Sequence, residues 1–282
     1  RDRPVNISTW VVIGAIILMA VISSVLSRWA KSRRNDKILA STLQRLKSPL
    51  IARYTDYIGV QGALTLQTCP HLHEGWQLSE IKMRHQTSEF TLPLAYSGAY
   101  DSYFKEHKEE KRFVDDRVKV MLRWNPIAFV DSPTLFLDTQ LTRYSYVQFY
   151  RDMVEKDPIL WNGLMTSLLG GNGQALFPHS LCLELVVVTK DDRILITRRS
   201  PKVAYDANKW SCSVAETMAE EDITVGNSNQ AIRHWLERFL KEELGLTTTD
   251  YNIANFRILS VFLESDIMNI SLCGLIRLEV DN

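Results

Sequence analysis

The residues best suited to chemistry in this chain are two adjacent carboxylates, Glu242 and Glu243, near the end of a predicted helix. Carboxylates spaced three and four residues apart meet on one helix face, where they can hold a divalent metal ion. One turn before them on the same helix face stands Phe239, which is not a carboxylate. We therefore expect at most weak Mg²⁺ binding at Glu242 and Glu243, no other cofactor and no full metal cluster.

Glu243 also lies on the predicted apolar stripe of this helix, which we place at about residues 229–244, ending at Gly245. The stripe consists of apolar residues at helical spacing, namely Ile232, Leu236, Phe239 and Leu240. A carboxylate on a core-facing stripe is costly unless it is hydrogen-bonded. We expect Glu243 to hold the loop before the helix through backbone N–H groups; metal binding and simple exposure are the alternatives.

A second set of chemically capable residues is basic and aromatic and lies around a loop between two predicted strands. Its members are Arg198, Arg199, Lys202, Tyr205, Lys209 and Trp210. Such side chains bind phosphates through charge-assisted hydrogen bonds and nucleobases through stacking, so we predict a ligand site here. For Trp210 taken alone, a position in the core is the favoured interpretation. For the arginines, a solvated hairpin is the alternative.

Residues 7–26 carry no charged side chain and are long enough to cross the roughly 30 Å hydrocarbon core of a bilayer as a helix. Trp10 and Trp29 flank this run, as interfacial tryptophans do. The residues after it are strongly basic and include Arg28, Lys31, Arg33, Arg34 and Lys37. The positive-inside rule therefore predicts a single-pass protein whose C-terminal part is cytoplasmic. The alternatives are an uncleaved signal peptide and a buried core helix.

The composition is typical of a folded protein in a reducing compartment. The hydrophobic fraction is 45% and the charged fraction is 23%, so most of the chain should pack a core. The net charge of zero argues against a dedicated nucleic-acid binder. The 4 cysteines show no paired spacing, which favours free thiols. His71 and His73 would share a strand face and could ligate zinc, although ordinary histidines are the favoured interpretation.

The chain divides into three predicted parts. Residues 1–36 form the membrane helix and its basic flank, residues 37–175 a helical connector and the first part of a soluble region, and residues 176–282 a separate domain. In this last part, strand-like runs surround the helix, at residues 181–189, 193–199, 210–214, 256–264 and 268–280. Their order predicts an α/β (α+β) fold, a mixed sheet with flanking helices. We expect a longer natural protein, because the chain starts at Arg1 and stops directly after a strand-like run.

The last part of the chain resembles a Nudix domain. The helical half of the Nudix box, R-E-U-x-E-E-x-G-U with U aliphatic, is matched by Arg238, Glu242, Glu243 and Gly245. Glu221 falls where the box has an isolated glutamate. The resemblance implies metal-dependent hydrolysis of diphosphates, but Phe239 replaces the first helical glutamate and Ala215 replaces the box glycine. We therefore expect a degenerate box with no catalytic residues, and the missing glutamate argues against an enzyme.

A membrane span joined to a degenerate Nudix-like domain resembles the SMODS-associated Nudix family of bacterial anti-phage (CBASS) effectors. The resemblance implies a sensor in the bacterial inner membrane that binds a cyclic oligonucleotide made by a partner nucleotidyltransferase. Binding would assemble a homo-oligomer whose clustered helices disrupt the lipid bilayer. The family is described with two membrane helices, whereas this chain shows one. The alternatives are an active, membrane-tethered Nudix hydrolase of nucleoside diphosphate derivatives and a protein-binding scaffold.

Overall fold

The structure is a computed structural model that describes residues 63–70, 74–109, 118–123, 132–157, 159–160, 177–201, 208–211, 213–223, 228–264 and 269–280. The predicted membrane helix and its basic flank lie outside these residues, as do His71, His73, Lys202 and Tyr205. In the part of the chain that is described, no helix is long and apolar enough to cross a membrane.

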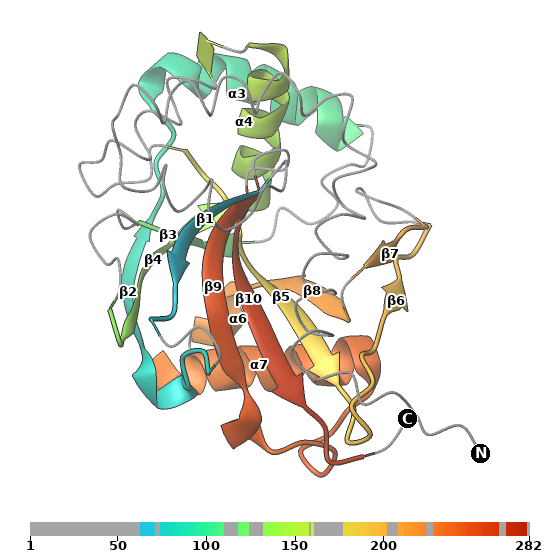
Figure 1. The fold of residues 1–282 in the computed structure, drawn as a ribbon. Helices are drawn as coiled ribbons and strands as arrows, with labels where there is room; N and C mark the ends of the chain where they lie inside the picture. Colours follow the sequence, from blue (N-terminus) through green and yellow to red (C-terminus); the bar gives the residue numbers. More distant parts are fainter. Residues whose placement is uncertain are drawn as a thin grey trace.

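A five-stranded mixed sheet forms the centre of the protein (Figure 1). Its strands, in spatial order, are β1 (Ala63–Thr68), β9 (Arg257–Glu264), β10 (Asn269–Arg277), β5 (Leu181–Val188) and β8 (Val214–Thr217). Strands β10 and β5 run parallel, and the other neighbouring pairs run antiparallel. The sheet and its helices confirm the predicted fold class at the level of a mixed α+β protein.

Strand β5 lies inside this sheet because its sequence is apolar on both faces. Every residue of β5 except Glu184 is buried. A strand covered on both faces carries a continuous apolar run rather than an alternating one, which is the pattern of the strand predicted at residues 181–189. Its neighbour β10 approaches closely at Gly274, where a Cβ atom would lie 2.8 Å from Cδ1 of Leu183. A larger residue at that position would force the neighbouring leucine side chains to shift.

A three-stranded sheet packs beside the first and contains, in spatial order, β2 (Ile81–Glu89), β4 (Leu135–Arg143) and β3 (Val118–Leu122). The two sheets meet at the end of β8, where the Val120 N–H donates to the Met218 carbonyl at 3.1 Å. The Met218 N–H donates in turn to the Leu181 carbonyl at 2.8 Å. Since β1 also pairs with β9, the predicted connector and the predicted C-terminal domain share one sheet and one core. The predicted boundary at residues 175–176 lies outside the described residues.

Helix α7 (Ser228–Leu244) is the helix predicted at residues 229–244, and a short helix, α6 (Glu220–Ile223), precedes it. Helix α7 ends at the predicted residue. Gly245 has a φ of 68°, and its N–H donates to the Lys241 carbonyl at 3.0 Å. Glycine adopts this left-handed conformation without strain. The whole predicted stripe of α7 is buried, as Ile232, Leu236, Phe239 and Leu240 have almost no exposed surface.

Helices α3 (Leu94–Glu109) and α4 (Tyr144–Lys156) lie together at the top of Figure 1. The sequence analysis does not predict either of them. They contact each other through edge-to-face aromatic pairs, such as Tyr100 with Tyr146 and Tyr100 with Phe149. Short 3-10 turns, η1 (Leu78–Glu80) and η3 (Ile253–Asn255), complete the described elements.

A two-stranded ribbon, β6 (Thr197–Arg198) and β7 (Trp210–Ser211), projects at the right of Figure 1. The strands predicted at residues 193–199 and 210–214 are thus correct in place but wrong in extent. Ser213 explains the second difference, because it bends the chain between β7 and β8. Its hydroxyl accepts from the Val187 N–H at 2.7 Å and donates to the Leu195 carbonyl at 2.6 Å. These bonds attach the base of the ribbon to β5.

His179 links the two sheets through a side chain that is fully buried. Its Nε2 accepts from the Leu122 N–H of β3 at 3.1 Å. The single proton of the neutral ring therefore lies on Nδ1, which donates to the Phe177 carbonyl at 3.3 Å. Burial lowers the pKa of His179 to about 4. Protonation of Nε2 would place two N–H groups against each other and break the link to β3.

We predict that His179 makes the protein less stable in acid. The unfolded chain protonates this ring below a pKa of about 6.5, whereas the folded chain does so only near 4. The free energy of unfolding should therefore fall, by at most about 3 kcal/mol, as the pH drops through this window. His179→Gln, which keeps one acceptor and one donor, should remove this contribution. Denaturant unfolding of both proteins between pH 7 and pH 4 measures it, and equal pH dependence would contradict the assignment.

Candidate functional site

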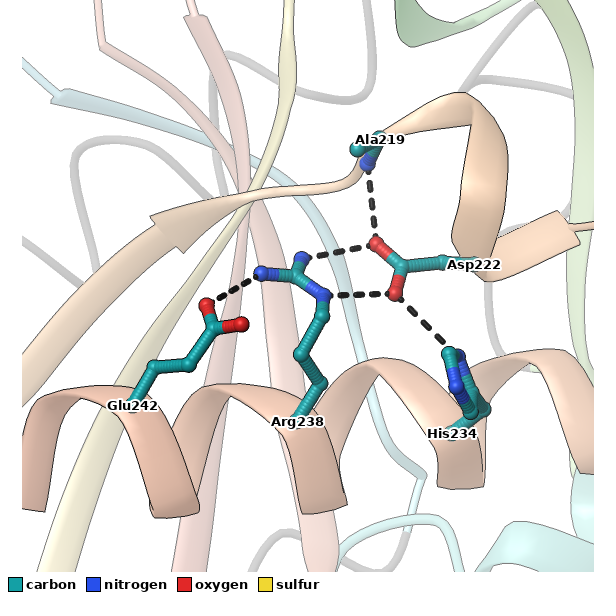
Figure 2. Close-up of polar contacts among 5 residues, drawn as sticks. All are labelled: Ala219, Asp222, His234, Arg238 and Glu242. Carbon is teal, nitrogen blue, oxygen red and sulfur yellow. Dashed lines mark hydrogen bonds and ion pairs between the residues drawn. The ribbon is translucent and has the colours of Figure 1, made fainter. Parts of the chain in front are cut away.

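The box residues lie where α6, α7 and the end of β8 meet, and Arg238 is the central side chain (Figure 2). Its Nε and Nη2 donate to the two carboxylate oxygens of Asp222 at 2.9 and 2.8 Å. Its Nη1 donates to Glu242, one helical turn further along α7, at 2.9 Å. The guanidinium thus donates two hydrogen bonds to Asp222, in a bidentate arrangement, and one hydrogen bond to Glu242.

Asp222 is the buried acid of this cluster, with a side chain that is 0% exposed. It also accepts the Ala219 N–H at 2.9 Å, which closes the turn between β8 and α6. His234 Nδ1 lies 3.4 Å from its other oxygen. A carboxylate removed from water is tolerated only when it is paired and hydrogen-bonded, and Asp222 has both kinds of partner. The hydrogen bond with Asp222 raises the pKa of Arg238, which keeps the guanidinium charged.

The acid that holds this loop is not one of the residues that the sequence analysis selects. Glu221, which matches the box pattern, is exposed, whereas the next residue, Asp222, faces α7. The analysis also overlooks His234. The spacing between Ala219 and Asp222 is a usable signal. Ala219 is the N-cap residue of α6, and an acid three residues after the N-cap can accept the N-cap N–H.

Glu242 and Glu243 have no third carboxylate beside them on α7, because the side chain at the third position, Phe239, is buried in the core. Both glutamates are exposed, and Glu242 turns toward Arg238. The prediction that Glu243 holds the preceding loop is therefore wrong, and its alternative of simple exposure is correct. In the last turn of α7 it is the neighbouring Leu244 that packs against the core, whereas Glu243 meets water. Within the described ranges, no group of three His, Cys, Asp or Glu side chains could hold a metal ion.

Glu216 on β8 is a further carboxylate near the box, and the sequence analysis does not single it out. It is half-buried, and burial raises its pKa. The positive charges of Arg238 and Lys119 act in the opposite direction, whereas Glu243 and Glu242 raise its pKa further. Arg238 therefore supplies positive charge to several carboxylates at once, including the fully buried Asp222.

The predicted ligand residues separate onto the two faces of the β6–β7 ribbon. Arg198 lies directly across from Trp210 on one face, and its Nε donates to the Asn208 carbonyl at 3.1 Å. Trp210 is 61% exposed, so the interpretation that places it in the core is wrong. The reason is that its strand belongs to the projecting ribbon and not to the central sheet. Arg199 and Lys209 follow on the opposite face, where both are half-buried.

A bulge at the end of the ribbon brings Arg199 and Lys209 together. The Arg199 N–H donates to the Lys209 carbonyl at 2.8 Å, and the Asn208 N–H donates to the Arg199 carbonyl at 3.1 Å. Asn208 and Lys209 thus both lie opposite Arg199, as the two residues of a β-bulge do. Asn208 takes the left-handed conformation with a φ of 65°. Two neighbouring cations on one face suit an anion such as a phosphate.

Comparisons with known proteins do not identify a family. No protein-family model matches the chain, and no curated protein matches it. The likeness to Nudix domains therefore rests on the sequence of the box residues alone. Functional statements beyond this point depend on the geometry of the box and of the ribbon.

We predict that Arg238→Met lowers the free energy of unfolding by about 3–5 kcal/mol, because it leaves Asp222 buried without its charged partner. Arg233→Met on the same helix is the matched control. It removes an exposed pair with Glu237 and should cost less than about 1 kcal/mol. Denaturant unfolding measures both. The double variant Asp222→Asn/Arg238→Met should recover part of the loss, since no charge remains buried. Equal costs for the two single variants would contradict the central role of the pair.

Proposed function

We propose that this protein is a membrane-anchored sensor-effector whose degenerate Nudix-like domain binds a cyclic oligonucleotide second messenger. The observation that carries the proposal is the occupation of the box by its own side chains. Phe239 belongs to the core, and Arg238 is bonded to Asp222 and Glu242. Mg²⁺ requires several free oxygen ligands in a defined geometry, and carboxylates already bonded to a guanidinium do not offer them. Binding without turnover is the behaviour that a sensor needs.

In this proposal, Arg199 and Lys209 bind the phosphates of the ligand. They share the half-buried face of the ribbon, where hydrogen bonds to charged groups are stronger than in open water. Lys202 and Tyr205, from the loop between β6 and β7, belong to the same site. Arg198 lies on the other face of the ribbon, so it cannot meet the same ligand surface as Arg199.

The anchor and the output of the proposed sensor rest on the sequence of residues 7–26 and on the basic residues that follow. The soluble part then lies in the cytoplasm, attached to the bacterial inner membrane. A partner nucleotidyltransferase supplies the messenger during phage infection. Ligand binding assembles the chains into a homo-oligomer, and the clustered membrane helices disrupt the bilayer.

The alternative is a membrane-tethered Nudix hydrolase of nucleoside diphosphate derivatives. The exposure of Glu242 and Glu243, together with the proximity of Glu216, favours this alternative, because these carboxylates remain accessible to ions from solvent. The box as a whole argues against it, since Phe239 leaves the helix one metal ligand short.

We predict no turnover of nucleoside diphosphate derivatives with Mg²⁺ or Mn²⁺, because the carboxylate cluster is incomplete. Chromatography of the products after long incubation with the full chain measures this, with an active Nudix hydrolase as the positive control. Steady turnover that Glu243→Gln abolishes would establish the hydrolase instead of the sensor.

We further predict that Arg199→Ala and Lys209→Ala each weaken the binding of a cyclic oligonucleotide by about ten- to a hundredfold. The physical reason is that loss of a charged hydrogen-bond partner costs about 1.5–3 kcal/mol. Calorimetry of the full chain in detergent, with a panel of cyclic di- and trinucleotides, measures the affinity. Arg233→Ala is the matched control, because it removes an exposed arginine of α7. Normal binding by both ribbon variants would place the site elsewhere.

A further inference from the structure

The side of the β6–β7 ribbon that carries Trp210 has no part in the proposed ligand site. Arg198 lies across from Trp210, so these two side chains share one face, and Ile196 stands just before β6, two residues before Arg198. Ile196 is 46% exposed and Trp210 is 61% exposed. We call Ile196, Arg198 and Trp210 the outer ribbon face. It combines apolar surface, one aromatic ring and a positive charge.

Contacts at the base and at the end of the ribbon hold this face outward. The Leu195 N–H donates to the Val187 carbonyl at 3.0 Å, and the Ser213 hydroxyl joins the same two residues. At the other end, Arg198 is bonded to the carbonyl of Asn208. Trp210 therefore stands on a ribbon that is fixed by hydrogen bonds at both ends. Figure 1 shows the ribbon standing away from the two larger sheets.

We propose that the outer ribbon face rests on the anionic surface of the membrane that anchors the chain. Trp210 and Ile196 enter the interfacial layer, and Arg198 meets lipid phosphates. Tryptophan favours this layer, and each basic residue near an anionic surface contributes about 1 kcal/mol. The sequence of this stretch has the complementary charge, because it contains the basic residues Arg198, Arg199, Lys202 and Lys209 and a single acid, Asp206. The inference rests on the membrane anchor of the proposed function.

A bilayer suits this face better than a soluble partner does. A stable protein interface buries about 800 Å² on each side, which three side chains of a two-stranded ribbon do not supply. A small ligand is held in a pocket that covers most of its surface, whereas Trp210 is open to water. A lipid surface needs neither condition. Because the anchor keeps the domain close to the bilayer, a weak contact is sufficient.

Tryptophan quenching by brominated lipids tests the contact on the full chain. The protein is reconstituted into vesicles of phosphatidylglycerol and phosphatidylcholine brominated near the headgroup, and flotation measures its attachment. If Trp210 touches the bilayer, Trp210→Phe removes a quenched emitter, and the quenchable fraction of the fluorescence falls. If Trp210 is in water, the same variant removes an unquenched emitter, and that fraction rises. We expect the fall.

Charge variants test the role of the anionic lipid. Arg198→Glu should reduce the Trp210 quenching by about twofold or more in anionic vesicles, because one attraction becomes a repulsion. Arg193→Glu is the matched control, since Arg193 is an exposed arginine on the turn before the ribbon, and it should leave the quenching unchanged. Equal effects of the two variants would contradict a specific contact at Arg198. Unfolding curves establish that each variant is folded.

The outcomes separate this contact from the proposed function. A chain that does not float with the vesicles overturns both the anchor and the membrane contact. Attachment with an unchanged or larger quenchable fraction in Trp210→Phe overturns the contact alone and leaves the anchor and the ligand site intact. A Trp210 signal that depends on the protein-to-lipid ratio identifies a second copy of the chain as the partner. A Trp210 signal that responds to a cyclic oligonucleotide without lipid identifies the ligand. Either result overturns the proposal.

Discussion

The ion pair between Asp222 and Arg238 is the interaction on which the arrangement of α7 depends. A carboxylate with no exposed surface closes the turn after β8 at Ala219 and holds the middle of the helix. The residue before that turn, Met218, is bonded to both sheets. Charges removed from water are costly unless every partner is in place, so the junction has one favourable geometry. The helix, the turn and the two sheets are positioned together by it.

The same pair changes what the box can do. The ring of Phe239 continues the core stripe at the position where a metal-binding helix would carry a carboxylate. Arg238 then supplies the positive charge that the remaining acids require, through direct bonds to Asp222 and Glu242. These bonds stabilise the junction between β8, α6 and α7. A stable domain of this kind supports the proposal of a binding function, in which the chemistry of hydrolysis is no longer needed.

Local patterns in the sequence were sufficient for much of the domain. The bounds of α7, its buried stripe and its end at Gly245 follow from helical periodicity and from the left-handed preference of glycine. Strands β5, β9 and β10 lie close to their predicted ranges. These features depend on residues that are near one another in the chain, so they are readable without knowledge of distant partners. Helices α3 and α4 lack such clear signals and were missed.

The sequence by itself thus determined α7, strands β5, β9 and β10 and the departures from the box, whereas the tertiary structure decided which side chains face inward. Glu221 and Asp222 are adjacent acids, and only the approach of Arg238 from α7 distinguishes them. Glu243 lies at the angle of the buried stripe, yet it is exposed while Leu244 packs against the core. Trp210 faces water because its strand joins the ribbon. In each case the outcome depends on a surface that is distant in the chain, and local spacing carries no information about it.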